Sequence, residues 1–149
     1  MVASSDSDWC VKNATAAWVV SVGGGPVSWA SKRERCVALS STQAELVAAS
    51  MAACEIVYLR HLAEDVGMRQ RNPTCLYIDN SGAIEIAKNP VASSALKHVL
   101  RRHFFVREAE ADGAIAVAPV ASADNVADLL TKWLAPERFK LLLARIRRG

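Results

Sequence analysis

The segment that most restricts the possible folds of this chain runs from Thr74 to Lys88. Its first part, Thr74–Ile78, is a short apolar stretch typical of a buried strand. Asp79-Asn80-Ser81-Gly82 follows directly and can cap a helix that ends at Asn89-Pro90. A strand that passes into a helix within a few residues is typical of α/β proteins. The sequence therefore predicts an α/β domain.

Periodicity and turn residues predict the other elements of a single domain covering residues 1–149. A first strand is expected to end near Asp6, followed by a hairpin that turns at Gly23-Gly24-Gly25. The longest helix is expected over Thr42–Val66, with Gly67 closing it. Further strands are predicted over residues 14–22, 26–31 and 114–120, and further helices over residues 96–111, 124–133 and 136–147. This order predicts a mixed sheet with helices on both faces.

Composition excludes several classes of protein. With 52% hydrophobic and 22% charged residues, the chain is neither disordered nor collagen-like. The 4 cysteines match no zinc-binding spacing, so we expect buried free thiols. The longest uncharged stretch, Asn13–Ser31, is interrupted by glycines and a proline. We therefore expect a soluble, intracellular protein without a membrane partner.

The charge distribution favours the second half of the chain as a binding surface. The formal charge is +3, and residues 76–149 account for all of it, with 11 Lys and Arg against 8 Asp and Glu. Such an excess suits a polyanionic partner such as a nucleic acid, but it equally suits a solvated helix end.

Four acidic residues are expected at one edge of the sheet. Asp6 lies where the first strand should end, and Asp79 ends the strand Thr74–Ile78. If these strands are parallel neighbours, their carboxylates emerge side by side, where open α/β sheets bind ligands. Glu45 and Asp128 lie in the first turns of predicted helices that can reach the same edge. Carboxylates from four elements, without a paired base, favour a hard divalent cation such as Mg²⁺.

Each of these acids also has a purely structural interpretation. Thr42-Gln43-Ala44-Glu45 has the pattern of a capping box, and Asp79 can cap the next helix. Asp128 is favourable at the positive end of a helix dipole, and Asp6 can be a turn residue. Asp8 competes with Asp6 as the first member of the set.

Nine short motifs, in a fixed order, connect the chain to a known family. They stand here as Ser5-Asp6-Ser7-Asp8-Trp9, Gly23-Gly24-Gly25-Pro26-Val27-Ser28-Trp29, Ser31-Lys32-Arg33, Val37-Ala38-Leu39-Ser40-Ser41-Thr42-Gln43-Ala44-Glu45, Tyr77-Ile78-Asp79-Asn80, Lys88-Asn89-Pro90-Val91, Lys97-His98, Phe105-Val106-Arg107-Glu108 and Ala127-Asp128-Leu129-Leu130-Thr131-Lys132. On these motifs the chain resembles the ribonuclease H domain of Ty1/copia-type LTR retrotransposons over nearly its whole length.

The resemblance implies a ribonuclease H-like fold, with a five-stranded mixed sheet flanked by helices. It places the catalytic and metal-binding tetrad on Asp6, Glu45, Asp79 and Asp128, holding two Mg²⁺ ions for which Mn²⁺ can substitute. The implied activity is hydrolysis of the RNA strand of an RNA/DNA hybrid during reverse transcription. The implied partners are that hybrid and the reverse transcriptase domain of the same polyprotein, in the element's cytoplasmic virus-like particle, with no small-molecule cofactor.

Further candidates for contact with the hybrid lie beside the tetrad and on the basic helix. They are Thr42, Gln43, Asn80, Ser81, Lys97, Arg101 and Arg102, whose structural alternatives are caps, turns and a solvated helix face. Many ribonucleases H carry a histidine before the last acid, but residues 119–127 contain none, so His98 or His103 is a candidate for that role. The alternative function is an inactive ribonuclease H-fold module that binds nucleic acid or protein.

Overall fold

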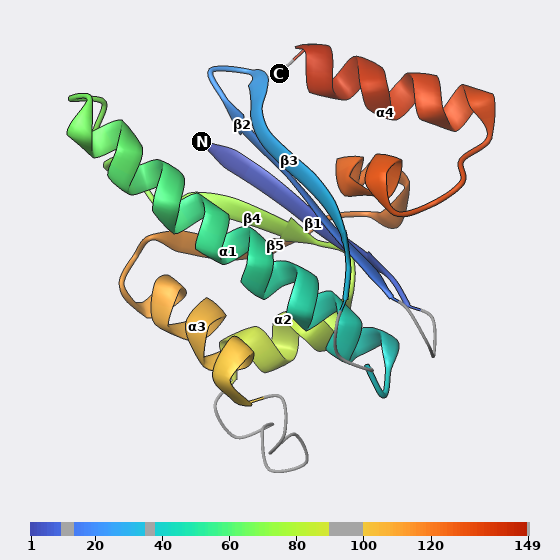
Figure 1. Ribbon diagram of the computed structural model, residues 1–149, viewed down its shortest axis with the longest axis horizontal. Helices are drawn as coiled ribbons and strands as arrows, with labels where there is room; N and C mark the ends of the chain where they lie inside the picture. Colours follow the sequence, from blue (N-terminus) through green and yellow to red (C-terminus); the bar gives the residue numbers. More distant parts are fainter. Residues whose placement is uncertain (10–13, 35–37, 90–99, 149) are drawn as a thin grey trace.

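The computed structural model describes residues 1–9, 14–34, 38–89 and 100–148, of which residues 100–104 and 147–148 are described by their backbone alone. Its centre is a five-stranded sheet in the order β3-β2-β1-β4-β5 (Figure 1). The strands are β1 (Val2–Asp8), β2 (Thr15–Val22), β3 (Gly25–Arg33), β4 (Thr74–Ile78) and β5 (Ile115–Pro119). The predicted five-stranded sheet is confirmed.

Strand directions make the sheet mixed. β1, β2 and β3 form an antiparallel meander, whereas β4 runs parallel to both β1 and β5. The β2–β3 turn uses Gly23 and Gly24 at φ values of 57° and 86°, a region that glycine adopts without strain. In the parallel β1–β4 pair, Ser4 lies level with Tyr77. Continuing that register by two residues brings Asp6 level with Asp79.

Helices cover both faces of the sheet, as predicted (Figure 1). α1 (Ser41–Asp65), α2 (Ser81–Lys88) and α3 (Leu100–Ala111) lie on one face, where α1 packs on β1, β2 and β4 and also contacts α3. α4 (Pro136–Arg148) lies on the other face and contacts β3.

The core lies between α1 and the sheet. α1 contributes a row of alanines that are 0% exposed, including Ala48, Ala49, Ala52 and Ala53, which allow the helix backbone to approach the strands closely. Leu76 and Ile78 of β4 pack against this surface. The length and hydropathy of α1 would also suit a membrane-spanning helix, but here the helix packs against the sheet.

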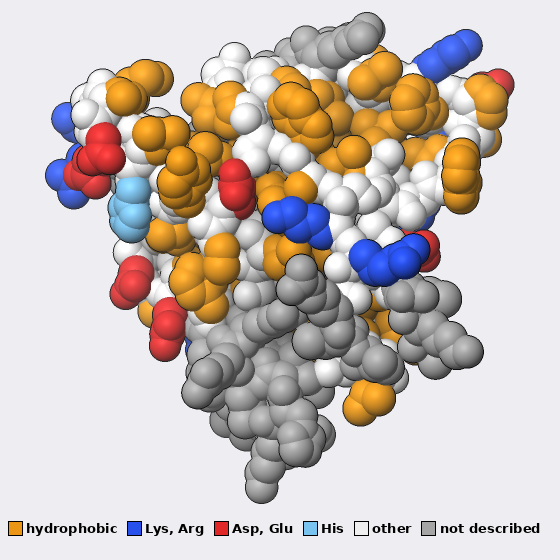
Figure 2. Space-filling model, viewed as in Figure 1, with side chains coloured by type: hydrophobic (Ala, Val, Ile, Leu, Met, Phe, Trp, Pro, Cys, Tyr) orange, Lys and Arg blue, Asp and Glu red, His pale blue; other side chains and the backbone are white. Residues whose placement is uncertain are grey.

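Apolar side chains are not all buried. Tyr58, Leu62 and Val66 near the end of α1 are exposed, and Figure 2 shows apolar side chains interspersed with charged ones over this face. Cys54 is exposed and Cys75 is partly exposed, so the prediction of buried thiols is wrong for these two residues.

One predicted helix is wrong. Two short 3-10 helices, η2 (Ser122–Asp124) and η3 (Val126–Leu130), occupy this part of the chain, and residues 124–133 form no α-helix. Asn125 separates them with an extended backbone, at φ −71° and ψ 107°. Its buried side-chain amide donates to the Ser5 carbonyl of β1 while its oxygen accepts from the Ala127 N–H. Bonding to the sheet fixes Asn125 in a conformation that a continuous helix could not adopt.

Candidate active site

Three of the four predicted acids meet at the carboxyl edge of the sheet. Asp6 comes from β1, Glu45 from α1, and Asp79 directly follows β4. One carboxylate oxygen from each lies within 4.8 Å of the others. The parallel β1–β4 register places Asp6 beside Asp79, and the packing of α1 across β1 adds Glu45.

Neither Glu45 nor Asp79 caps a helix, so these two structural interpretations are wrong. The N-cap of α1 is Ser40, whose hydroxyl accepts from the Gln43 N–H, while Gln43 Oε1 accepts from the Leu39 N–H at 2.7 Å. The N-cap of α2 is Asn80, whose Oδ1 accepts from the Ala83 N–H. Neighbouring residues satisfy the helix ends, and both carboxylates are available for another purpose.

Glu45 is the most perturbed member of the cluster. It is 6% exposed, and its Oε1 accepts from the Ser7 N–H at 3.3 Å. Its Oε2 is buried and has no hydrogen-bond partner among the described residues. Burial, followed by the negative charges of Asp6 and Asp79, raises the pKa of Glu45 to about 9. A buried carboxylate oxygen without a donor, beside two further carboxylates, fits a hard divalent cation that prefers oxygen ligands.

Without a metal ion, Glu45→Gln is expected to stabilise the protein above acidic pH. The folded carboxyl holds its proton up to a pH of about 9, whereas the unfolded one releases it near 4.5. Between these values the folded state binds more protons than the unfolded state, so wild-type stability falls as pH rises. Because Gln does not titrate, the free energy of unfolding of Glu45→Gln at pH 8 should exceed that of wild type by on the order of 1 kcal/mol or more. Its Tm should rise by about 2–4 °C for each kcal/mol.

The measurement is thermal unfolding in EDTA between pH 5 and pH 9, with the exposed Glu85→Gln on α2 as the control. The control should follow the wild-type pH dependence. If Glu45→Gln follows it as well, Glu45 carries no unfavourable buried charge.

Asp128, the fourth predicted acid, lies outside this three-acid cluster. It is 1% exposed on η3 and is paired with two cations. Lys132 Nζ donates to Asp128 Oδ1 at 2.8 Å, and Arg138 of α4 donates to Asp128 Oδ2 at 2.5 Å. Burial raises the pKa of the Asp128 carboxyl, although the Lys132 hydrogen bond and both cations oppose that shift.

Lys132 links Asp128 to the cluster. Its Nζ also lies 3.1 Å from Asp6 Oδ1, while the Thr131 hydroxyl donates to Asp6 Oδ2. Burial alone would lower the Lys132 pKa, but the hydrogen bonds and charges of Asp128 and Asp6 more than offset this, so the pKa is raised. The structure therefore places all four acids in one connected region. Lys132 pairs with both Asp6 and Asp128, whereas Glu45 and Asp79 form no ion pair among the described residues.

Sequence reasoning missed the residues that support this region. Thr131, Lys132 and Arg138 pair with the acids, and Asn125 fixes η3 to β1. A signal for two of them was present, because Thr131 and Lys132 close the motif that begins at Ala127. Arg138 lies on a separate helix, and nothing in its sequence context indicates Asp128 as its partner.

The predicted contacts for nucleic acid fall into two groups. Thr42 and Asn80 lie together, since a Cβ on Gly82 would come within 3.2 Å of Thr42 Oγ1 and 3.3 Å of Asn80 Oδ1. Gln43 and Asn80 serve as caps, as their structural interpretation predicted, and Ser81 is exposed at the start of α2. Lys97 and His98 lie outside the described residues, as do the side chains of Arg101, Arg102 and His103.

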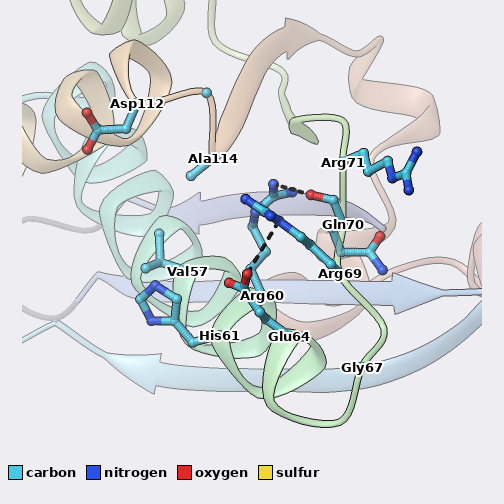
Figure 3. A pocket seen from close by; sticks show the side chains of 11 residues that line it. Val57, Arg60, His61, Glu64, Gly67, Arg69, Gln70, Arg71, Asp112 and Ala114 are labelled. Carbon is cyan, nitrogen blue, oxygen red and sulfur yellow. Dashed lines mark hydrogen bonds and ion pairs between the residues drawn. The ribbon is translucent and has the colours of Figure 1, made fainter.

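A separate cavity of about 740 Å³ lies at the opposite end of the sheet (Figure 3). It is lined by residues that precede β4 and β5, such as Gln70 and Gly113, and by the end of α1. Arg60 donates there to the carbonyls of Gln70 and Asn72, and Arg69 pairs with Glu64. These arginines hold the loop after α1 and lie away from the cluster of Asp6, Glu45 and Asp79.

The chain is similar in sequence to large polyproteins. It is 34% identical over 148 residues to the retrovirus-related Pol polyprotein from transposon RE1 of Arabidopsis thaliana, covering 97% of this chain and 10% of that protein. It is 32% identical over 130 residues to the corresponding polyprotein from transposon TNT 1-94 of Nicotiana tabacum, covering 87% and 10%. The chain thus spans about a tenth of the length of these relatives. No model of a known protein family matches it.

Solved structures with a similar fold are ribonuclease H domains. The N-terminal RNase H domain of a Mycobacterium tuberculosis protein superposes with a TM-score of 0.63 at 14% identity, covering 96% of this chain and 95% of that one. RNase H1 of Halobacterium salinarum gives 0.58 at 22% identity, covering 87% and 92%. At these identities the comparison establishes the fold.

Proposed function

This chain is a homologue of part of the Ty1/copia-type retrovirus-related Pol polyproteins and has the ribonuclease H fold, and from this premise we propose that it is a metal-dependent endoribonuclease. Its substrate is the RNA strand of an RNA/DNA hybrid formed during reverse transcription. The observation that carries the proposal is that one carboxylate oxygen each of Asp6, Glu45 and Asp79 lies within 4.8 Å of the others, in a cluster where the buried Glu45 Oε2 has no hydrogen-bond donor among the described residues.

The four acids are proposed to hold two Mg²⁺ ions, or Mn²⁺ in their place. Bound ions of this kind polarise a phosphodiester and help to ionise the attacking water. Glu45 is protonated near neutral pH without a cation, because burial and its acidic neighbours disfavour its charge. A divalent cation reverses that preference, so ion binding and ionisation of Glu45 occur together.

The chain's own residues then orient the scissile bond. The N-terminal ends of α1 and α2 come together where Thr42 lies beside Asn80 and Gly82. Helix N-termini attract phosphate, so this corner is suited to a strand of the hybrid. Water attacks the phosphorus, the bond to the 3′ oxygen breaks, and the products carry a 5′ phosphate and a 3′ hydroxyl. Recognition is expected to depend on 2′-hydroxyls and groove shape, and not on base sequence.

Two parts of the proposal concern the longer polyprotein. Since the relatives are about ten times as long as this chain, we propose that the domain acts beside the reverse transcriptase of the same polyprotein. Its action in a cytoplasmic virus-like particle stays a prediction.

The test uses the 149-residue chain with end-labelled RNA/DNA hybrid, double-stranded RNA and double-stranded DNA, each with Mg²⁺, Mn²⁺ or EDTA. We expect cleavage only of RNA paired with DNA, and only when a divalent ion is present. Equal cleavage of the two-stranded DNA, or full activity in EDTA, contradicts the proposal. Binding of the hybrid without cleavage under every condition supports the alternative of an inactive binding module.

A further inference from the structure

The part of the four-acid region formed by Asp6 and Asp128 already contains a positive charge from Lys132. Asp6 and Asp128 are 0% and 1% exposed and together offer four carboxylate oxygens. Lys132 Nζ bonds to one oxygen of each, at 3.1 Å to Asp6 Oδ1 and 2.8 Å to Asp128 Oδ1. Thr131 and Arg138 donate to the two remaining oxygens. All four oxygens therefore have a donor supplied by the segment after β5.

The part formed by Glu45 and Asp79 has no ion pair of this kind among the described residues. Glu45 Oε2 is buried without a donor among the described residues, and the oxygens of Asp6, Glu45 and Asp79 that lie within 4.8 Å of one another come from three carboxylates. Charge is thus unevenly distributed: internal cations balance the Asp6–Asp128 side, whereas the Glu45–Asp79 side lacks a comparable ion pair among the described residues.

The position of Lys132 restricts where a divalent ion can enter. An ion between Asp6 and Asp128 would share its ligands with the ammonium group, and like charges a few ångströms apart repel strongly where little water screens them. The Lys132 side chain is 37% exposed. Its unbranched stem has several rotatable bonds, so it can swing toward solvent when another cation takes its place.

We propose that the Lys132 ammonium occupies the second cation position of the site, between Asp6 and Asp128. The first divalent ion binds at Asp6, Glu45 and Asp79 while Lys132 stays in place. The second ion binds only by displacing the ammonium, so Lys132 weakens the affinity of the second site. When that ion is absent, Lys132 balances the negative charge of Asp6 and Asp128. Lys132 is therefore a positioning residue. This inference rests on the proposed function, because it assumes that the acids bind divalent ions.

The test counts bound Mn²⁺ without substrate, by calorimetry and by the electron paramagnetic resonance signal of the free ion. Lys132→Met removes the ammonium but keeps a side chain of similar length. We expect wild type to bind one ion tightly and a second weakly, and Lys132→Met to bind the second about tenfold or more tightly. Lys132→Arg keeps a cation and should bind the second ion weakly, as wild type does.

Thermal unfolding provides the second measurement. Without ions, Lys132→Met should melt below wild type because two buried carboxylates lose their shared cation, and Mn²⁺ should raise its Tm by more than it raises that of wild type. The exposed Lys140 on α4 provides the control variant Lys140→Met, which should match wild type in both measurements.

Unchanged affinity for the second ion in Lys132→Met overturns the inference, and so does a variant that fails to fold even with Mn²⁺, since the ion could not then replace the ammonium. These outcomes are independent of the proposed activity. A wild-type chain that binds ions as described but leaves the hybrid intact contradicts the proposed function alone.

Discussion

Asp79→Asn is expected to reduce hybrid cleavage at least about a hundredfold, since even residues that only support a metal ligand typically cost 10- to 100-fold when replaced. The substitution should leave the fold intact. Asn80, and not Asp79, caps α2, so the helix end keeps its hydrogen bond. The negative charge of Asp79 also raises the pKa of Glu45, and its removal relieves repulsion in the cluster. We therefore expect stability without metal to be unchanged or higher.

Cleavage of labelled hybrid in Mg²⁺ and thermal unfolding in EDTA, measured on the same preparation, test this expectation. Asp112→Asn is the matched control, because Asp112 is exposed and belongs to the cavity at the opposite end of the sheet. Retained cleavage in Asp79→Asn would exclude Asp79 from catalysis, and an equal loss in Asp112→Asn would show that the loss is not specific to the acidic cluster.

Asn125→Ala is expected to affect stability and cleavage together. Asn125 is 0% exposed, donates to the Ser5 carbonyl and caps η3 through the Ala127 N–H. Losing a buried hydrogen bond and a cap typically costs about 1–3 kcal/mol, and Tm should fall by about 2–4 °C per kcal/mol. Since η3 carries Asp128, cleavage at a temperature well below Tm should also fall by about tenfold or more.

Asn72→Ala is the comparison for Asn125→Ala, because Asn72 is exposed in the loop before β4. It should change neither Tm nor cleavage measurably. A destabilised Asn125→Ala that cleaves at the wild-type rate would show that Asn125 holds η3 without contributing to the placement of Asp128.

Local sequence patterns were sufficient to predict most of the secondary structure. The apolar stretch Thr74–Ile78 and the periodic segment after Ser41 predict β4 and α1 because alternation and helical period are properties of neighbouring residues. The approach of Asp6 to Asp79 was also predictable, since it requires only that two adjacent parallel strands end at one edge. The exception was residues 124–133, where Asn125 bonds to a strand 120 positions earlier.

What the sequence by itself determined is therefore the order of the strands and of the α-helices outside residues 124–133, the mixed sheet and the set of acids that can reach its carboxyl edge. The tertiary structure alone decided how those acids divide. Asp6, Glu45 and Asp79 come together, and Asp6 is also paired with Lys132. Asp128 is paired with Lys132 and with Arg138 of α4. The physical reason is the sequence distance over which each interaction acts. Periodicity and helix caps involve residues a few positions apart, whereas Lys132 and Asp6 are 126 positions apart. Their contact therefore depends on the packing of η3 against the sheet.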